Sequence, residues 1–330
     1  MGLKRTKVRR RGFVLIIVLC TVIMLEVLLL GFNYRCRNNL RAVDHLQRSQ
    51  QALNCARAGL NIAIAAIRDA PDIREDKPLP ELFSSTGSLA VGPGQCSISL
   101  TEESSKLNVN LLKDKNGTLN RTRIDQVLRL IDLLNRQKLG YSTVSYGLVP
   151  AIIDWTDKDE QVTQLPFVQR ENLGAESSYY LRLDPAYRCK NRPLNAIDEM
   201  LLIKEVTPEI FEHLRACLTV HGDGKVNINS APQPVIESLC EDMDPAVAQM
   251  IIERRELKPF ESIVDLRDVP GMTDSIYEAI KNTVTVSSEG QYYRVESRGN
   301  VGHLGWTIEA ILRRNPQTKS AEVVFYRERR

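Results

Sequence analysis

The segment that decides the fold is residues 9–32, which reads RRRGFVLIIVLCTVIMLEVLLLGF. From Phe13 to Phe32 it contains twenty residues with a single formal charge, at Glu26. A helix of that length and polarity spans the roughly 30 Å hydrocarbon core of a bilayer. The six Lys and Arg residues before it, with no acidic residue among them, predict a cytoplasmic N-terminus and an exported C-terminal part.

A cleaved secretory signal is the first alternative to a permanent anchor. Its apolar core would be about 7–15 residues long, and a small-residue cleavage site would follow it. The segment Gly31–Arg35 offers no such site. A plain single-pass anchor and a processed precursor both remain open. Glu26 either lies near the outer interface or pairs with a group of another subunit.

Gly12 separates the basic cluster from the aromatic residue that opens the span. This arrangement resembles the leader of type IV prepilins and type II secretion pseudopilins, in which a membrane peptidase cuts after the glycine and the new N-terminal residue is methylated. The resemblance implies cleavage between Gly12 and Phe13, with methylation of Phe13. Ile17 replaces the glutamate that these families usually carry four residues after the new N-terminus. The general secretion pathway protein K family, the subunit of the pseudopilus tip, characteristically lacks that glutamate.

Composition limits the classes of partner. The chain has 330 residues, enough for two or more domains, and its 43% hydrophobic and 26% charged residues are ordinary for globular protein. The net charge of +3 comes from the leader: without its six positive residues, 38 Lys and Arg face 41 Asp and Glu. The exported part is therefore mildly acidic, and bulk charge gives no support to a nucleic-acid partner.

Residues 33–70 predict an amphipathic stem that continues the membrane helix. No proline occurs in this segment before Pro71, and four apolar residues recur every seven positions: Leu46, Leu53, Leu60 and Ile67. This stripe packs either on the chain's own globular domain or on the stems of neighbouring subunits. The two interpretations can hold along different lengths of the helix, and the second makes the stripe a partner interface.

Alternating apolar residues predict strands on both sides of a long helical segment. Residues 95–100 and 106–111 alternate near the N-terminal side, and residues 292–297 and 306–312 do so near the C-terminus. The predicted fold class is α+β: a pilin-like α/β domain with an antiparallel sheet, made of residues 71–117 and 284–330. A mainly helical domain, residues 118–283, is inserted between its strands.

Several short segments also resemble the protein K family, in the same order along the chain. They include Lys106–Asn110, Asp154–Asp159, Gly174–Glu176 and Val226–Pro232. The resemblance implies a calcium site in the helical domain, with Asp157, Asp159 and Glu176 as ligands. Ser177 stands where family members often have a further acid. A solvated acidic loop is the alternative, with Asp154 as a helix cap.

A DNA-binding function is the main rival. Residues 226–283 also resemble the helix-hairpin-helix units of DNA-uptake receptors, which bind phosphates through hairpin amides at a helix N-terminus. The first hairpin, 240–245, has three acids and no glycine, and residues 205–285 contain 15 acids against seven Lys and Arg. Such a surface repels DNA, so we interpret this SAM-like scaffold as a protein-interaction domain.

Catalysis has no support in the sequence. The four histidines show no catalytic or ligand spacing, and neither G-x-S-x-G nor a P-loop occurs. No C-x-x-C pair occurs either. Four cysteines of the exported part, Cys96, Cys189, Cys217 and Cys240, allow three disulfide connectivities or remain free thiols.

The resemblance implies a minor pseudopilin of the type II secretion system that initiates or caps the pseudopilus tip. Its expected place is the bacterial inner membrane, crossed once, with the C-terminal domain in the periplasm. The expected partners are other minor pseudopilins through the stem, the prepilin peptidase and exported substrate proteins, with no nucleic acid. The alternative is a membrane-tethered helix-hairpin-helix DNA receptor.

Overall fold

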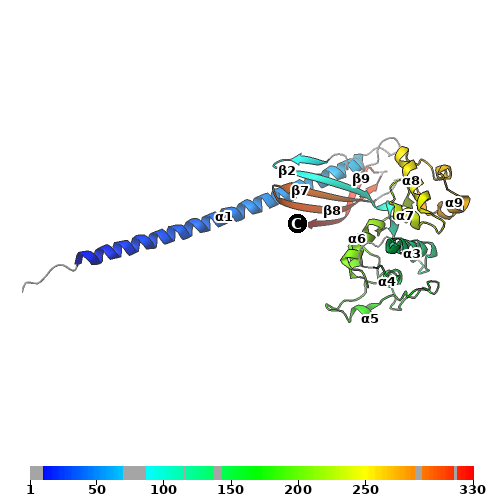
Figure 1. The fold of residues 1–330 in the computed structure, drawn as a ribbon, viewed down its shortest axis with the longest axis horizontal. Coiled ribbons are helices and arrows are strands. Elements are labelled where there is room, and N and C mark those ends of the chain that lie inside the picture. The colour runs from blue at the N-terminus through cyan, green and yellow to red at the C-terminus, as the bar shows by residue number, and fades with distance from the viewer. Residues whose placement is uncertain (1–9, 70–86, 115, 137–142, 287–291, 316–317) are drawn as a thin grey trace, which may run out of the picture.

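One long helix dominates the shape of the molecule. The computed structural model describes residues 10–69, 87–114, 116–136, 143–286, 292–315 and 318–330. Helix α1, Arg10–Asp69, is 60 residues long and projects from the rest of the chain as a rod (Figure 1). Within the described ranges it is the single helix long and apolar enough to cross a membrane, with a mean hydropathy of 3.1 in its most apolar window. The predicted anchor is thus a continuous part of this helix.

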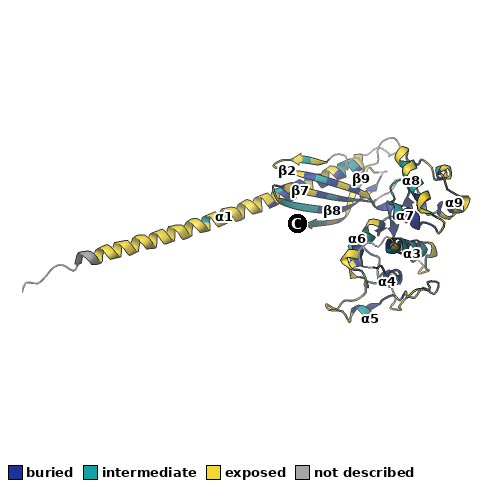
Figure 2. Ribbon diagram, in the orientation of Figure 1, coloured by how far each residue is buried: buried dark blue, intermediate teal, exposed yellow. Residues whose placement is uncertain are grey.

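The C-terminal third of α1 lies on a five-stranded antiparallel sheet (Figure 1). The sheet has the order β1-β2-β7-β8-β9, from strands Ser88–Val91, Gly94–Glu102, Tyr292–Val301, Leu304–Asn315 and Ser320–Arg329. The core between helix and sheet contains Leu53, Leu60 and Ile67 packed with Ile98 and Val295. From Phe13 to Arg48, α1 is exposed apart from the half-buried Cys36 (Figure 2).

Two glycines let the stem approach the sheet backbone closely. A Cβ atom built on Gly299 of β7 would lie 2.2 Å from the carbonyl oxygen of Ala52 and 2.3 Å from the amide nitrogen of Ala56. On the helix side, a Cβ on Gly59 would lie 2.2 Å from Ser297 Oγ. Ser297 Oγ instead donates a hydrogen bond of 2.8 Å to the Ala56 carbonyl. Helix and strand therefore meet backbone to backbone at this point.

The residues between β2 and β7 in the chain are mainly helical. The α-helices are α3 Arg121–Arg136, α4 Leu148–Thr156, α5 Ser177–Tyr180, α6 Pro208–Cys217, α7 Gln233–Ser238, α8 Pro245–Leu257 and α9 Asp274–Ile280. Short 3-10 helices are η1 Glu103–Ser105, η2 Val109–Leu111, η3 Ile197–Leu202 and η4 Ile263–Asp268. All of these helices except η1 contribute residues to one hydrophobic cluster, which is separate from the core under the stem. The α+β class predicted from the sequence is confirmed.

The predicted strand at 106–111 is not part of the five-stranded sheet. Residues Leu107–Asn108 form the short strand β3, which pairs in parallel with β4, Leu218–Thr219. The predicted strand is thus confirmed at Leu107–Asn108, but its length and its place in the sheet were wrong. Leu107 and Val109 alternate with polar residues because both are buried in the helical cluster. The strands β1 and β9, which form the two edges of the sheet, were not predicted.

An internal repeat explains this short strand. The motif Leu107-Asn108-Val109-Asn110 recurs as Val226-Asn227-Ile228-Asn229, and its strand β5, Val226–Asn227, pairs in parallel with β6, Val284–Thr285. The second asparagine of each motif makes equivalent hydrogen bonds to backbone groups. Asn110 binds the amide and carbonyl of Leu194 and the carbonyl of Val220. Asn229 binds the amide and carbonyl of Phe260 and the carbonyl of Val286. The helical region therefore contains two copies of one unit.

The ends of the two copies align without a gap, residues 192–220 with residues 258–286. Each contains a 3-10 helix, a threonine-capped α-helix and a short strand, and the caps are Thr207 and Thr273. The residue two positions before each cap has a positive φ, 67° at Glu205 and 86° at Gly271. The first copy is longer between its motif and residue 192, and this extra chain contains α4 and α5.

A buried ion network joins the sheet to the helical part. Glu103 Oε1 accepts from Lys106 Nζ at 2.9 Å and from Arg294 Nε of β7 at 2.8 Å. Burial alone would raise the pKa of Glu103, but these two cations outweigh it and hold the pKa at about 2. Arg294 also pairs with Glu309 of β8, so one cation serves both parts of the chain.

Candidate functional sites: an acidic cluster and an exposed stem

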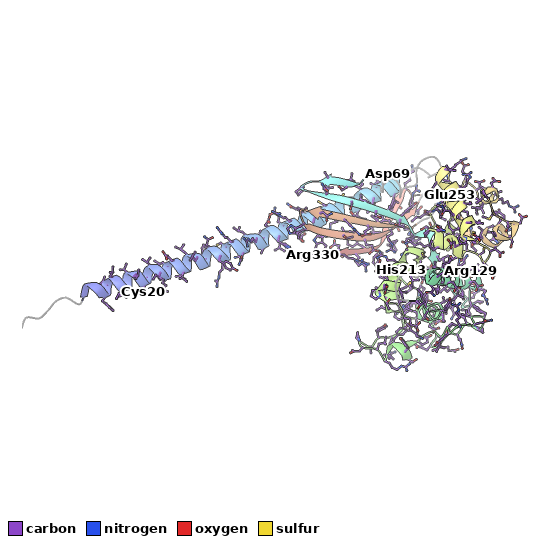
Figure 3. All side chains as sticks on the ribbon, viewed as in Figure 1. Cys20, Asp69, Arg129, His213, Glu253 and Arg330 are labelled. Carbon is purple, nitrogen blue, oxygen red and sulfur yellow. The ribbon has the colours of Figure 1, made fainter. Side chains whose placement is uncertain are left out.

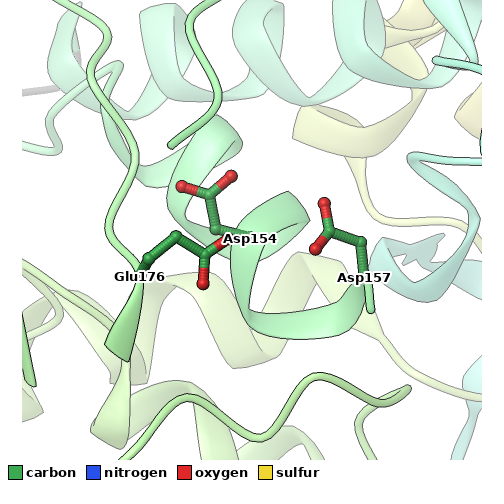
Figure 4. Close-up of side chains that lie close together, drawn as sticks. All are labelled: Asp154, Asp157 and Glu176. Atoms are coloured by element: carbon green, nitrogen blue, oxygen red, sulfur yellow. The ribbon is translucent and has the colours of Figure 1, made fainter. Parts of the chain in front are cut away.

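Three carboxylates converge at the end of α4. Asp154 lies in the last turn of α4, Asp157 follows that helix directly, and Glu176 precedes α5 (Figure 4). One oxygen from each lies within 4.8 Å of the others. The i, i+3 spacing of the two aspartates places them on one side of the helix end. The cluster lies in the chain segment that the second copy of the repeat lacks.

Backbone contacts fix Asp154 in the cluster. Its two oxygens accept from the Thr163 amide at 3.0 and 3.2 Å, and the residue is fully buried. Gly174 passes directly beside it: a Cβ there would lie 2.1 Å from Asp154 Oδ2. Because no larger residue fits, Gly174 allows the chain to bring Glu176 up to the aspartates.

The carboxylate of Glu176 is buried without a hydrogen-bond partner among the described residues. The residue is 1% exposed, and neither of its carboxylate oxygens has a hydrogen-bond partner. Burial, followed by the negative charges of Asp154 and Asp157, raises the pKa of Glu176 to about 8. Burial also raises the pKa values of Asp154 and Asp157, although Lys113 pairs with Asp157 and opposes the rise there.

The cluster fits a hard divalent cation. Buried polar atoms in folded proteins nearly always have partners, and three unpartnered oxygens meet here: both of Glu176 and Asp157 Oδ1. Calcium takes six to eight oxygen ligands from carboxylates, carbonyls and water. Three carboxylates supply part of such a shell, and a bound cation would also offset the burial and the mutual repulsion that raise their pKa values.

The predicted ligand set is brought together only in part. Asp157 and Glu176 meet, whereas Asp159 lies outside the cluster, is exposed and accepts from the Gln161 amide at 2.9 Å. Asp154 takes its place. The interpretation of Asp154 as a helix cap is wrong, because this residue lies within α4 rather than at its N-terminus. Ser177 donates to Glu160 Oε1 at 2.9 Å, which keeps that carboxylate beside the cluster.

The predicted partner stripe on the stem belongs mostly to the chain's own core. Leu53, Leu60 and Ile67 are at most 6% exposed and pack against the sheet, so they are unavailable to a partner. Leu46 is 63% exposed. It continues an apolar row on the free part of α1 that also includes Leu40 and Val43, 69% and 60% exposed. The candidate partner interface is therefore the exposed row Leu40, Val43 and Leu46, which lies closer to the apolar N-terminal half of α1 than the predicted stripe does.

The leader lies mostly outside the described residues. Residues 1–9 are not described, and Gly12 and Phe13 lie near the start of α1. Phe13 and Ile17 are exposed on the isolated helix, as expected for an apolar span. Cleavage between Gly12 and Phe13 stays a prediction.

The helix N-termini of the hairpin scaffold already have capping partners. Asp244 caps α8 by accepting from the Ala246 amide at 2.7 Å, and Thr273 caps α9 by accepting from the Ile276 amide. A phosphate at α8 would have to displace a carboxylate of the same charge sign. The hairpins therefore do not favour DNA binding.

All seven cysteines are free thiols in this structure. Cys20 lies on the free part of α1, far from the sheet (Figure 3). Cys55 and Cys96 lie in one small cluster between stem and sheet, while Cys189, Cys217 and Cys240 are buried in the helical region.

Two family models, both described as type II secretion system (T2SS), protein K, match residues 105–223 and 226–287. Together they cover more than half of the chain, and the break between them separates the two copies of the repeat. Protein K of Pseudomonas aeruginosa is 24% identical over 324 residues, covering 94% of this chain and 90% of that protein. Protein K of Klebsiella pneumoniae is 23% identical over 298 residues, covering 85% and 86%.

A solved structure shares the fold. The crystal structure of the GspK-GspI-GspJ complex from the enterotoxigenic Escherichia coli type 2 secretion system contains a chain that superposes with a TM-score of 0.62. That match covers 90% of this chain and 99% of the other, at 19% sequence identity. Sequence models, full-length relatives and fold agree: the chain belongs to the type II secretion system protein K family of minor pseudopilins.

Proposed function

We propose that this chain is the tip subunit of a pseudopilus. It is inserted in the bacterial inner membrane with residues 1–12 in the cytoplasm and its sheet and helical part in the periplasm. The prepilin peptidase cuts between Gly12 and Phe13 and methylates Phe13. The observation that carries this proposal is α1: an apolar helix that continues without a break into the core of a pilin-like sheet.

Ile17 supports a position at the end of the filament. In most subunits a carboxylate at this place neutralises the terminal amine of a neighbour, and an unpaired charge in an apolar filament is costly. A subunit with Ile17 has no such carboxylate to offer. Such a subunit forms no ion pair with the terminal amine of a neighbour above it, as is expected for the subunit at the tip of the filament.

The exposed stem supports assembly with other minor pseudopilins. The complex to which this fold is similar is named for three components, GspK, GspI and GspJ. On the present chain, Leu40, Val43 and Leu46 form an apolar row that no part of the described chain covers. Helical stems of partner subunits would bury this row. The helical part lies beyond the far end of the sheet, where its bulk would oppose addition of a further subunit (Figure 1).

A calcium ion held by Asp154, Asp157 and Glu176 would serve structure rather than chemistry. It would tie the end of α4 to the segment before α5, in the long connection of the first repeat copy. The role of the whole chain is assembly during protein export, with exported proteins as transient partners.

Site-specific photocrosslinking in cells that contain the complete secretion system tests the stem interface. A photoreactive residue at Leu46 is expected to give covalent adducts with other minor pseudopilins. The matched control is Leu257 in α8, which is 86% exposed but lies away from the stem. Adducts at Leu257 and none at Leu46 would contradict the proposal.

A further inference from the structure

Two buried thiols face the same small space between the stem and the sheet. Cys55 belongs to α1 and Cys96 to β2, and their exposed fractions are 2% and 0%. They share a cluster with Ala52 and Val301 that is distinct from the main core. The pKa of Cys96 is raised by burial and then by the neighbouring Cys55.

Gly299 brings the two cysteines together. It is the direct cross-strand partner of Cys96 in the pairing of β2 with β7. A Cβ built on Gly299 would lie 2.9 Å from the Cβ of Cys55. Cβ positions of opposed residues in an antiparallel pair are about 4.5–5.5 Å apart. Cys55 therefore occupies the place of the side chain that would normally stand beside Cys96.

A second contact locates the sulfur of Cys96 under the stem. A Cβ built on Gly59 would lie 3.3 Å from Cys96 Sγ. Gly59 is one helical turn beyond Cys55, on the same face of α1, and such positions have Cβ atoms about 5–6 Å apart. A disulfide requires Cβ atoms about 3.5–4.5 Å apart, and the contacts of Gly299 and Gly59 are compatible with such a separation between the Cβ atoms of Cys55 and Cys96. At present Cys55 Sγ donates to the Val91 carbonyl at 3.3 Å, a weak bond that is easily exchanged.

We propose that Cys55 and Cys96 are a modification site, oxidised to a disulfide that links the stem helix covalently to the sheet. The inference rests on the proposed export of the C-terminal part into an oxidising compartment. The oxidant is a protein disulfide of an exported thiol oxidoreductase. One thiolate attacks that disulfide to give a mixed disulfide, and the second thiolate then displaces the carrier. The two cysteines lose two electrons and two protons, and the carrier is reduced to a dithiol.

The bond forms as the domain folds. In the folded chain both thiols are buried, and burial raises the pKa values of Cys55 and Cys96, so little reactive thiolate exists. The carrier must therefore act before the sheet closes on α1. Once formed, the bond transmits any pull on the membrane helix directly to β2, without reliance on the packing between helix and sheet.

Peptide mapping of the full-length chain tests the proposal. The chain is taken from membranes of a bacterial host with intact periplasmic thiol oxidation, its free thiols are alkylated, and trypsin is added without reductant. Residues 49–57 and 75–106 are then separate peptides, each with one cysteine. The expected result is a joined pair of these peptides that separates on reduction.

Cysteine variants and a protease-accessibility assay distinguish failure of the disulfide proposal from failure of the proposed export. Cys55→Ser should abolish the joined pair and leave Cys96 alkylated, whereas the control Cys217→Ser, at another buried thiol, should retain it. Protease digestion of spheroplasts reports independently whether the C-terminal part is exported. Alkylated Cys55 and Cys96 in a protease-accessible domain overturn the disulfide. Alkylated cysteines in a protected domain overturn the export on which it rests.

Discussion

Arg294 on β7 donates its Nε–H to Glu103 across 2.8 Å, and this ion pair connects the five-stranded sheet to the helical part. Glu103 is fully buried, and Arg294 extends the contact to Glu309 on β8. Further cations of the same region, Arg215 and Arg327, also reach Glu309. The relative placement of the two parts of the molecule depends on a desolvated network rather than on apolar packing alone.

Arg294→Met should destabilise the chain strongly. It leaves Glu103 buried with one cation instead of two, and breaking a buried pair costs about 3–5 kcal/mol. The control Arg298→Met breaks an exposed pair with Glu296 on the same strand and should cost at most about 1 kcal/mol. Denaturant unfolding of the full-length chain in detergent measures both. Equal losses would show that the buried network has no special role.

Gly299→Ala should loosen the stem. The new methyl group would overlap the backbone of Ala52 and Ala56, which cannot move aside, and overpacking of this kind costs about 1–3 kcal/mol. In Gly305→Ala the nearest atom is Asn300 Oδ1, the end of a side chain that can rotate away, so a smaller loss is expected. Thermal unfolding compares the variants, and a loss at Gly305 as large as that at Gly299 would argue against close backbone contact.

Calcium binding should release a proton. With a pKa of about 8, Glu176 is mostly protonated at pH 7 in the free protein and must ionise to bind a cation. Titration calorimetry at pH 7 in two buffers of different ionisation enthalpy should give close to one proton released per ion. Glu176→Gln should weaken binding at least tenfold, and the control Asp159→Asn much less. Binding without proton release, or equal losses in both variants, would remove Glu176 from the site.

Without calcium, stability should fall as the pH rises. The folded chain keeps the Glu176 proton up to about pH 8, whereas the unfolded chain loses it near its ordinary pKa of 4.5. The folded state thus binds more protons between these values, and the free energy of unfolding decreases by up to about 1.4 kcal/mol per pH unit. Unfolding of chelator-treated Glu176→Gln should show a shallower slope in this window. A wild-type slope no steeper than that of the variant would contradict the shifted pKa.

Sequence patterns predicted those features that depend on local periodicity. The apolar run from Phe13 and the strands near residues 95 and 292 follow directly from spacing, and the structure contains them. The alternation at 106–111 was ambiguous, because burial of Leu107 and Val109 against helices gives the same pattern as a strand. The repeat of the asparagine motif was visible in the sequence and would have resolved this ambiguity.

The acidic cluster shows where spacing is not enough. Asp154, Asp157 and Asp159 lie within one short segment, but only the fold decides which of them face Glu176. The helix continues to Thr156 and turns Asp154 inward, while Asp159 lies in the exposed loop. On the stem, likewise, the seven-residue spacing identified an apolar stripe but not the point at which the sheet ends and exposure begins.

N-terminal sequence and intact mass of the chain from membranes that contain the prepilin peptidase test the central claim most directly. The account predicts a chain that begins at N-methylated Phe13, and a Gly12→Val variant that keeps its leader. If Met1 to Gly12 remain attached to the wild-type chain when the peptidase is active, α1 is only an anchor, and the assignment to the pseudopilus tip is contradicted.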